Sequence, residues 1–211
     1  MKLHGYWLVY GIIGINISVF LCFYAAKSTF KRGDARSLKW MAENFTFSAG
    51  NIRQGRMPVH FIRVSWTLVT SAFAHHSTIH LLMNTLGLWR LRPDAQYLGS
   101  YSFLTVYLAG AVGSSLASAY WNQNHPVHGM GASGAMNAVK SFMACMTPRS
   151  SVTLFGIPMS LWVAEAGIFL YDLYRVESGS RRLTSIGFEG HIGGTMTGIA
   201  LFFVRRGLGI A

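Results

Sequence analysis

The sequence predicts an all-α, polytopic membrane protein whose six transmembrane helices form one compact bundle. The 211 residues are 51% hydrophobic, with a mean hydropathy of +0.33. Only 12% of them are charged, about half of the roughly 25% that soluble globular domains carry. Six apolar runs also approach the about 20 residues that a helix needs to cross a hydrocarbon core of about 30 Å. Most connections between the runs are short, so we expect residues 1–211 to form a single membrane domain.

The first three spans are expected at 6–26, 72–91 and 101–121. The first run contains no charged residue. A cleavable signal peptide is the alternative interpretation, but the run is longer than the roughly 7–15 residues of a signal-peptide apolar region. The third run carries Ala109, Gly113 and Ala117 at four-residue spacing, which favours close packing against another membrane helix.

The last three spans are expected at 131–147, 158–174 and 187–204. The fourth stops before Pro148 and the fifth begins at Pro158, because proline does not continue a helix beyond its first turn. The sixth run ends at two arginines, and its glycines Gly194 and Gly198 repeat the spacing of small residues seen in the third run.

One connection, the first loop at 27–65, is long. Leu38, Met41, Ala42 and Phe45 follow helical spacing within it, and basic and aromatic residues flank them. This pattern predicts a short amphipathic helix at the membrane interface. A solvated loop with incidental periodicity is the alternative.

The basic residues indicate which surroundings the loops meet. The chain has 18 Lys and Arg against 7 Asp and Glu, a net charge of +11. Nucleic-acid binders gather such residues into a patch on a soluble body, whereas here they separate apolar runs and face lipid headgroups. We therefore expect a lipid bilayer and no nucleic acid as a partner. Cys22 and Cys145 both lie in apolar runs and argue against a disulfide scaffold.

Polar groups inside a bilayer are costly, so each is a candidate for function. The candidates in the predicted spans are His80, Asn84, Ser133, Asn137, Lys140, Glu165 and His191.

Ser133 and His191 form the most informative pair. Gly131 and Gly134 leave the serine hydroxyl open to close approach, and His191 lies on a glycine face of the sixth span. If the two helices pack, the imidazole reaches the hydroxyl, and a serine nucleophile needs such a base. A packing serine and a hydrogen-bonded histidine are the structural alternatives.

His80 and Asn84 are four residues apart, on one face of the second span. Together with the Ser133 backbone N–H they are able to form an oxyanion hole; inter-helix hydrogen bonds are the alternative. A zinc site is disfavoured, because His75, His76 and His80 have no His-Glu-x-x-His motif and no carboxylate near them in sequence.

A Ser–Lys pair is also disfavoured. Lys140 lies seven residues after Ser133, about 10 Å along a helix, which is too far for a direct hydrogen bond. We expect Lys140 to extend toward the interface or to pair with Glu165. No acidic third member of the site is evident, since Glu189 is two residues from His191 and points elsewhere on the helix.

Three motifs in this order resemble the rhomboid family of intramembrane serine proteases over nearly the whole chain. They are His80-x-x-x-Asn84, Gly131-x-Ser133-Gly134 and Gly190-His191-x-x-Gly194-x-x-x-Gly198. The stretches 70–75, 107–110 and 131–135 are similar to the mitochondrial, PARL-type branch. One departure is Asn137, where many bacterial rhomboids have an aromatic residue that packs on the histidine.

The resemblance implies roles for the matching positions. Ser133 is expected as the nucleophile and His191 as its general base, with His80 and Asn84 stabilising the oxyanion. The implied packing residues near the site are Gly131, Gly134, Gly194 and Gly198. No metal and no cofactor are implied.

The expected function is hydrolysis of a peptide bond in or near the transmembrane helix of single-span membrane proteins by a Ser–His dyad. The alternative is a proteolytically silent rhomboid-like protein that binds membrane clients. Six spans place 6 Lys and Arg on the side of the N-terminus and 11 on the side of the first loop. Since basic loops stay on the synthesis side, the first loop is expected to face matrix or cytoplasm. The branch implies the mitochondrial inner membrane.

Overall fold

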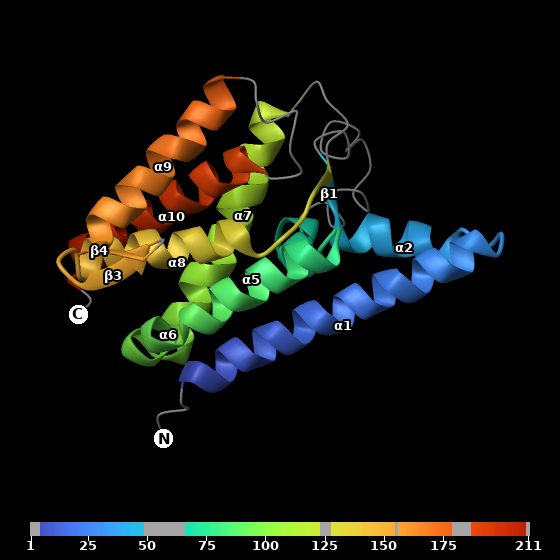
Figure 1. Cartoon of the computed structure of the whole chain (residues 1–211), viewed down its shortest axis with the longest axis horizontal. Helices are drawn as coiled ribbons and strands as arrows, with labels where there is room; N and C mark the ends of the chain where they lie inside the picture. Colours follow the sequence, from blue (N-terminus) through green and yellow to red (C-terminus); the bar gives the residue numbers. More distant parts are fainter. Residues whose placement is uncertain (1–4, 49–65, 123–127, 155, 179–186, 210–211) are drawn as a thin grey trace.

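The computed structural model describes residues 5–48, 66–122, 128–154, 156–178 and 187–209. These residues are mostly helical, as predicted, and form one layered bundle (Figure 1). In chain order the elements are α1 (Gly5–Lys31), α2 (Arg36–Phe45), β1 (Phe47–Ser48), η1 (Ser71–Phe73), α5 (Thr78–Arg90), α6 (Arg92–Leu98), α7 (Ser100–Trp121), β2 (His128–Gly129), α8 (Ser133–Met146), β3 (Ser151–Leu154), β4 (Ile157–Ser160), α9 (Leu161–Glu177) and α10 (Phe188–Gly207).

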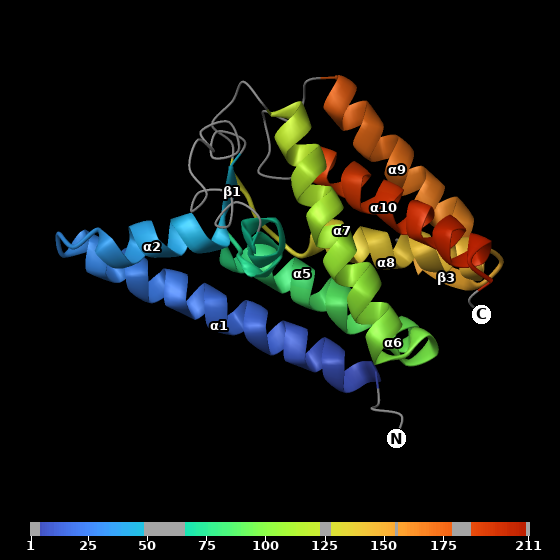
Figure 2. The same cartoon turned by 180° about the vertical axis from the view of Figure 1, so that it is seen from behind.

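Helix α8 is the centre of the bundle. It packs against α7 and α10 and also contacts α5 and α9 (Figure 2). Ten of its 14 residues are buried, so neighbouring elements enclose most of its surface. Its Ala135 and Val139 join a core cluster with Phe103 and Tyr107 of α7. The first residue of α8 is Ser133, which is therefore fixed to the most enclosed element of the fold.

Glycines allow α10 to approach α8 and α7 at backbone distance. A Cβ atom at Gly194 would overlap the carbonyl oxygen of Gly134, and one at Gly198 would overlap that of Ala138. On the other flank, Gly113 of α7 faces the Thr197 side chain of α10. The small residues of the third, fourth and sixth predicted spans thus meet one another, as close packing of membrane helices requires.

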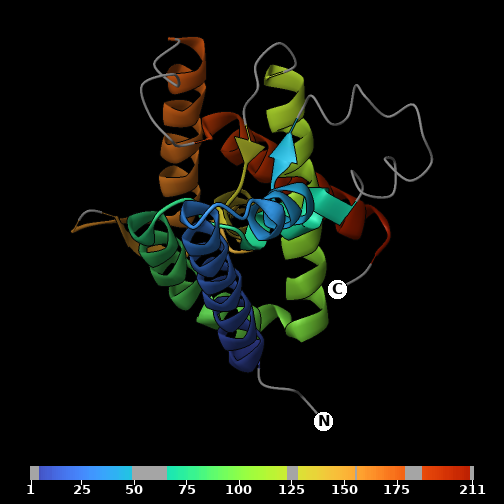
Figure 3. The same cartoon turned by 90° about the vertical axis from the view of Figure 1, so that its right-hand side faces the viewer.

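Helix α1 packs along the bundle with one face and leaves the other open. Its buried positions follow helical spacing from Val9 through Asn16 to Ala26, whereas Trp7 and Tyr24 are exposed. Within the described residues, two helices, α1 and α7, are long and apolar enough to cross a membrane by their own length and composition. Figure 3 shows α7 and α9 on opposite sides of the bundle, with α1 between them in that view.

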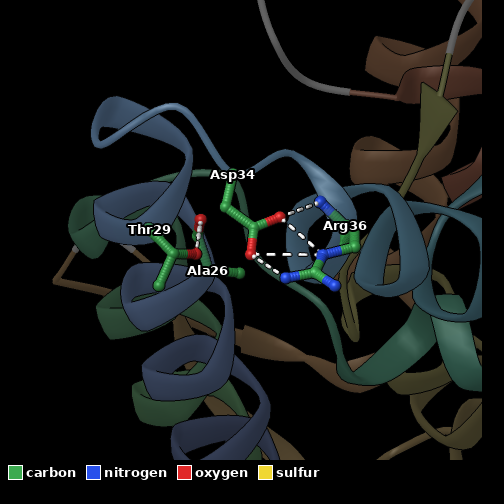
Figure 4. A network of polar contacts seen from close by, with 4 residues as sticks. All are labelled: Ala26, Thr29, Asp34 and Arg36. Carbon is green, nitrogen blue, oxygen red and sulfur yellow. Dashed lines mark hydrogen bonds and ion pairs between the residues drawn. The ribbon is translucent and has the colours of Figure 1, made fainter.

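A tight turn reverses the chain between α1 and α2. Gly33, at φ +96°, ends α1 in a left-handed conformation that glycine adopts without strain. Asp34 then accepts hydrogen bonds from the backbone and guanidinium of Arg36, while Thr29 donates its hydroxyl to Ala26 (Figure 4). These bonds from Arg36 lower the pKa of the Asp34 carboxyl.

The predicted amphipathic helix in the first loop is present as α2. Three of its apolar residues face the protein: Met41 is buried, and Leu38 and Phe45 pack beside it, against Val19 and Phe23 of α1, whereas Trp40 is exposed. Helix α2 therefore lies back along the end of α1 (Figure 1). The rest of that loop, from 49 to 65, lies outside the described residues.

The bounds of several helices differ from the approximate spans predicted from the sequence. The first helix continues to Lys31 rather than ending at residue 26. The second span was expected from residue 72, but α5 begins only at Thr78, because the Ser77 hydroxyl accepts a hydrogen bond from the His80 backbone and caps the helix there. The fifth span was expected from residue 158, but α9 begins at Leu161.

The chain also contains strands that an all-α prediction did not include. β3 and β4 form an antiparallel hairpin before α9, with Gly156 at φ +82° in its turn. β1 pairs antiparallel with β2, joining Phe47 to Gly129. This second pairing ties the end of α2 to the segment that leads into α8.

Candidate active site

Ser133 begins α8 directly after a bent, glycine-containing segment. Gly131 adopts φ +124°, a region that residues with a side chain rarely occupy. Its N–H donates to the Ser71 carbonyl at 2.9 Å, which fixes the segment to η1. Because Ser133 is in the first turn of α8, its backbone N–H has no acceptor within the helix. The hydroxyl and a free backbone donor therefore lie at the same residue.

His191 lies in the first turn of α10, and its imidazole faces this hydroxyl. The Nε2 atom is 2.8 Å from the Ser133 Oγ, although the two residues are 58 positions apart in sequence. The approach depends on small neighbours, since a Cβ at Gly134 or at Gly190 would overlap Ser114 of α7. The two residues singled out in the sequence are thus brought into hydrogen-bond contact.

Asp172 of α9 is a member of this constellation that the sequence analysis missed. Its Oδ1 is 3.4 Å from the Nδ1 of His191, and the residue is only 3% exposed. The carboxylate, imidazole and hydroxyl therefore follow one another in a line. A signal existed in the sequence, because Asp172 is one of two acids in the apolar run 158–174 and is as costly in a bilayer as Glu165, which was considered.

The His80 side chain lies beside the same segment. Its ring is so close to Gly131 that a Cβ there would lie 2.8 Å from Nε2. Asn84, one turn later on α5, donates its Nδ2 to the His80 carbonyl at 2.8 Å, and its buried Oδ1 has no partner among the described residues. His80 is therefore adjacent to the serine segment, whereas the Asn84 amide is directed along its own helix.

Three histidines gather around this end of α5. The His80 ring lies 5.0 Å from that of His75 and 4.4 Å from that of His76, measured between centroids. In the part of the chain that the structure describes, no group of three or more His, Cys, Asp or Glu is arranged to hold a metal ion.

An aromatic residue contacts His191 even though Asn137 replaces the one expected from α8. Phe188, one turn earlier on α10, meets the imidazole edge-on at 6.1 Å. The Arg175 guanidinium of α9 lies over the Phe188 ring at 4.7 Å. Phe188 of α10 therefore supplies the aromatic contact that Asn137 does not, and Arg175 of α9 lies over the Phe188 ring.

Lys140 lies deeper in the bundle, away from the serine. Its charge acts on Glu165 of α9 and on Asp94 of α6, but no direct ion pair joins Lys140 to Glu165 in the described ranges. Burial raises the pKa of the Asp94 carboxyl to about 6, and the Lys140 charge partly offsets this. These groups form a second polar cluster, which is separate from Ser133.

Comparison with known proteins identifies the family of this chain. A family model described as the rhomboid domain matches residues 63–207. The mitochondrial RHOMBOID-like protein 12 of Arabidopsis thaliana is 30% identical over 95% of this chain and 59% of its own length. Rhomboid protein 1, mitochondrial, of Saccharomyces cerevisiae is 28% identical over 94% of this chain and 53% of its own.

A bacterial relative is named a protease. Rhomboid protease GluP of Bacillus subtilis is 31% identical over 69% of this chain and 26% of its own length. The chain thus spans little more than half of the mitochondrial relatives and about a quarter of the bacterial one. The mitochondrial relatives agree with the branch that the motifs indicated. Because the domain model covers most of the chain, including Ser133, His191 and His80, this membrane protein belongs to the rhomboid family.

Proposed function

We propose that the protein is an intramembrane serine endopeptidase. The observation that carries the proposal is the 2.8 Å contact between His191 Nε2 and Ser133 Oγ. A serine hydroxyl is a weak nucleophile until a positioned base accepts its proton. The protease name of the bacterial relative supports the same reaction class.

In the first chemical step, the Ser133 oxygen attacks the carbonyl carbon of the scissile peptide bond while its proton passes to His191 Nε2. The bond to the leaving amine then breaks, and the imidazolium returns the proton to that amine. An ester between Ser133 and the substrate remains. Water, deprotonated by the same nitrogen, attacks the ester and releases the carboxylic acid and the free serine.

The oxyanion formed in each attack needs donors in place before the charge develops. The Ser133 backbone N–H, unpaired within α8, is one donor. His80 is the second, since its ring lies against Gly131. Asn84 is the third, and it has to turn its Nδ2 away from the His80 carbonyl, to which it donates in the free protein.

The substrate is a single-span membrane protein, cleaved in or near its transmembrane helix. Six spans, formed by α1, α5 and α7 to α10, surround the site in the bilayer, so the substrate helix reaches it laterally. That helix must unwind locally, because a helical carbonyl is hydrogen-bonded and shielded. The names of the plant and yeast relatives support a mitochondrial location, which we propose to be the inner membrane.

A fluorophosphonate probe tests the activated serine. The purified protein is labelled in detergent and compared with Ser133→Ala and His191→Ala. Ser150→Ala is the control, because this serine is exposed just beyond the other end of α8. We expect labelling of the wild type and the control only.

A model single-span substrate is then incubated with the same four proteins. If a folded wild type neither labels nor cuts it, the protease proposal fails and the client-binding alternative gains support.

A further inference from the structure

We propose that Asp172 completes a Ser133–His191–Asp172 triad, as the positioning residue that fixes the tautomer and orientation of the His191 ring. The proposal rests on the proposed function and deepens it. It departs from the dyad that the sequence led us to expect. Its basis is that both ring nitrogens of His191 have partners, Ser133 on α8 and Asp172 on α9.

A role in positioning His191 explains why the Asp172 carboxylate is buried. Its side chain is 4% exposed, and moving a carboxylate out of water is costly unless a charged or donating group meets it. Within the described residues its Oδ1 contacts His191 and its Oδ2 has no partner. A carboxylate that served only to join helices would be expected to hold several donors. This one is directed at a single ring nitrogen.

The geometry selects one tautomer. Because a carboxylate only accepts hydrogen bonds, the proton belongs on Nδ1, and Nε2 keeps its lone pair toward the Ser133 hydroxyl. That is the form in which the ring is able to remove the serine proton. When the proton arrives, the nearby carboxylate stabilises the imidazolium. The 3.4 Å distance is longer than the about 2.7–2.9 Å of a strong charged hydrogen bond, so we expect a moderate contribution.

The contacts between α9 and α10 hold Asp172 at this distance. Val176 of α9 packs with Phe188 and Ile192 of α10. The Arg175 guanidinium lies over Phe188 and donates a hydrogen bond to the Tyr171 hydroxyl oxygen at 2.7 Å. These contacts flank Asp172 on the α9 side and His191 on the α10 side.

Other titratable groups around the imidazole have separate partners or positions. Glu189, on the same helix, accepts a hydrogen bond from Asn122 of α7. His80 on α5 is close enough to respond to the His191 charge. On α9, Arg175 stacks on Phe188, and Glu165 lies two turns before Asp172. Among these groups, only the Asp172 carboxylate is within hydrogen-bond reach of the Nδ1 atom.

The test compares Asp172→Asn, Asp172→Glu and the control Glu165→Gln with the wild type, using a cleavable transmembrane substrate. Glu165 is a second buried carboxylate on the same helix, so its variant reports the effect of removing a buried charge from α9. For Asp172→Asn we expect kcat to fall about 100-fold with little change in KM, less than the about 10⁴-fold loss in serine proteases with a tight Asp–His bond.

The pH profile of kcat/KM distinguishes a positioning role of Asp172 from a purely structural role. Without the carboxylate the imidazolium loses its counter-ion, so the acidic limb of the kcat/KM profile moves to lower pH in Asp172→Asn. Asp172→Glu restores part of the rate, and Glu165→Gln keeps the wild-type limb. Wild-type activity and an unmoved limb in Asp172→Asn would overturn the proposal, as would an equal loss in the control.

A measurement without substrate distinguishes a failure of the triad proposal from a failure of the protease proposal. Nitrogen NMR of ¹⁵N-histidine-labelled protein, with His191→Ala to assign the signal, reports the tautomer directly. We expect a proton on Nδ1 in the wild type and a mixture in Asp172→Asn. A wild-type His191 protonated on Nε2 at pH 8 would refute the triad, whether or not the protein cleaves the substrate.

Discussion

Gly194 of α10 lies directly against the backbone carbonyl of Gly134, the residue after the proposed nucleophile. A Cβ at Gly194 would overlap that oxygen, and a backbone atom of the central helix has little room to move away. Because Gly194 has no Cβ atom, α10 and α8 are able to approach this closely at the site. The distance from His191 to Ser133 depends on this close approach.

Gly194→Ala should therefore destabilise the protein and separate the two residues. We expect a loss of about 1–3 kcal/mol, typical of overpacking, measured as a lower unfolding temperature in detergent together with weaker probe labelling. Gly167→Ala on α9 is the matched control, because nothing lies near a Cβ there and alanine is the better helix former. A control that loses as much stability as Gly194→Ala would contradict this reasoning.

His80→Ala should slow the chemical step without weakening substrate binding. Removing one oxyanion donor typically lowers kcat by about 100-fold or more, and we expect that range with a near-constant KM. The comparison is His76→Ala, since the His76 ring also lies beside the His80 ring but His76 is exposed. A loss that appears mainly in KM would show that His80 serves binding instead.

Asp94 should make the protein less stable as the pH rises. Burial raises its folded-state pKa to about 6 from its ordinary value of 3.8, so the folded chain binds more protons than the unfolded chain between these values. Stability then falls from about pH 4 to above pH 6. Asp94→Asn should raise the unfolding temperature at pH 8, and the gain should disappear near pH 4.

The contribution of Asp34 to stability should change with pH in the opposite direction to that of Asp94. Its pKa is lowered by Arg36, so its contribution is present above the unfolded pKa and is lost as the pH falls through the folded value. Asp34→Asn should therefore be least stable relative to wild type near neutral pH. If both variants shifted in the same direction with pH, the assignment of these two carboxyls would be wrong.

Asn122→Ala should destabilise the protein because it leaves the Glu189 carboxylate without the donor seen in the structure. A buried acceptor left unpaired typically costs about 1–3 kcal/mol. The double variant Asn122→Ala with Glu189→Gln should recover part of the loss, since no charge then remains buried. Urea or SDS unfolding of the four proteins completes the cycle, and strictly additive losses would indicate that the pair does not interact.

The sequence predicted Ser133 and His191 because glycine spacing on two helices is a local property. Gly134, Gly194 and Gly198 mark faces that must pack in lipid, and the two candidate residues lie on those faces. Periodicity alone therefore placed the pair on facing surfaces, and the three ordered motifs identified the family.

Asp172 could not be placed in this way. Its contact with His191 depends on how α9 is rotated against α10, and the connection between those helices includes residues outside the described part of the chain. Periodicity within α9 carries no information about that rotation. The cost of a buried acid would have identified Asp172 as a candidate without giving it a partner.

The strands were missed for a different reason. β1 and β2 pair across about 80 residues, and two-residue strands leave no alternating pattern to recognise. The hairpin of β3 and β4 was within reach of the sequence, because its short apolar segments flank Gly156 in the loop after Pro148.

The length of α8 makes the thickness of the bilayer relevant to the proposed reaction. With 14 residues against 27 in α1, it is about 21 Å long, whereas α1 is about 40 Å long. The hydrocarbon core is about 30 Å thick, so the helix that begins with Ser133 falls about 9 Å short of it. In lipids with longer acyl chains, a substrate must bring its scissile bond further below the headgroups. The same protein and substrate would then react at rates that depend on the acyl chain length of the surrounding membrane.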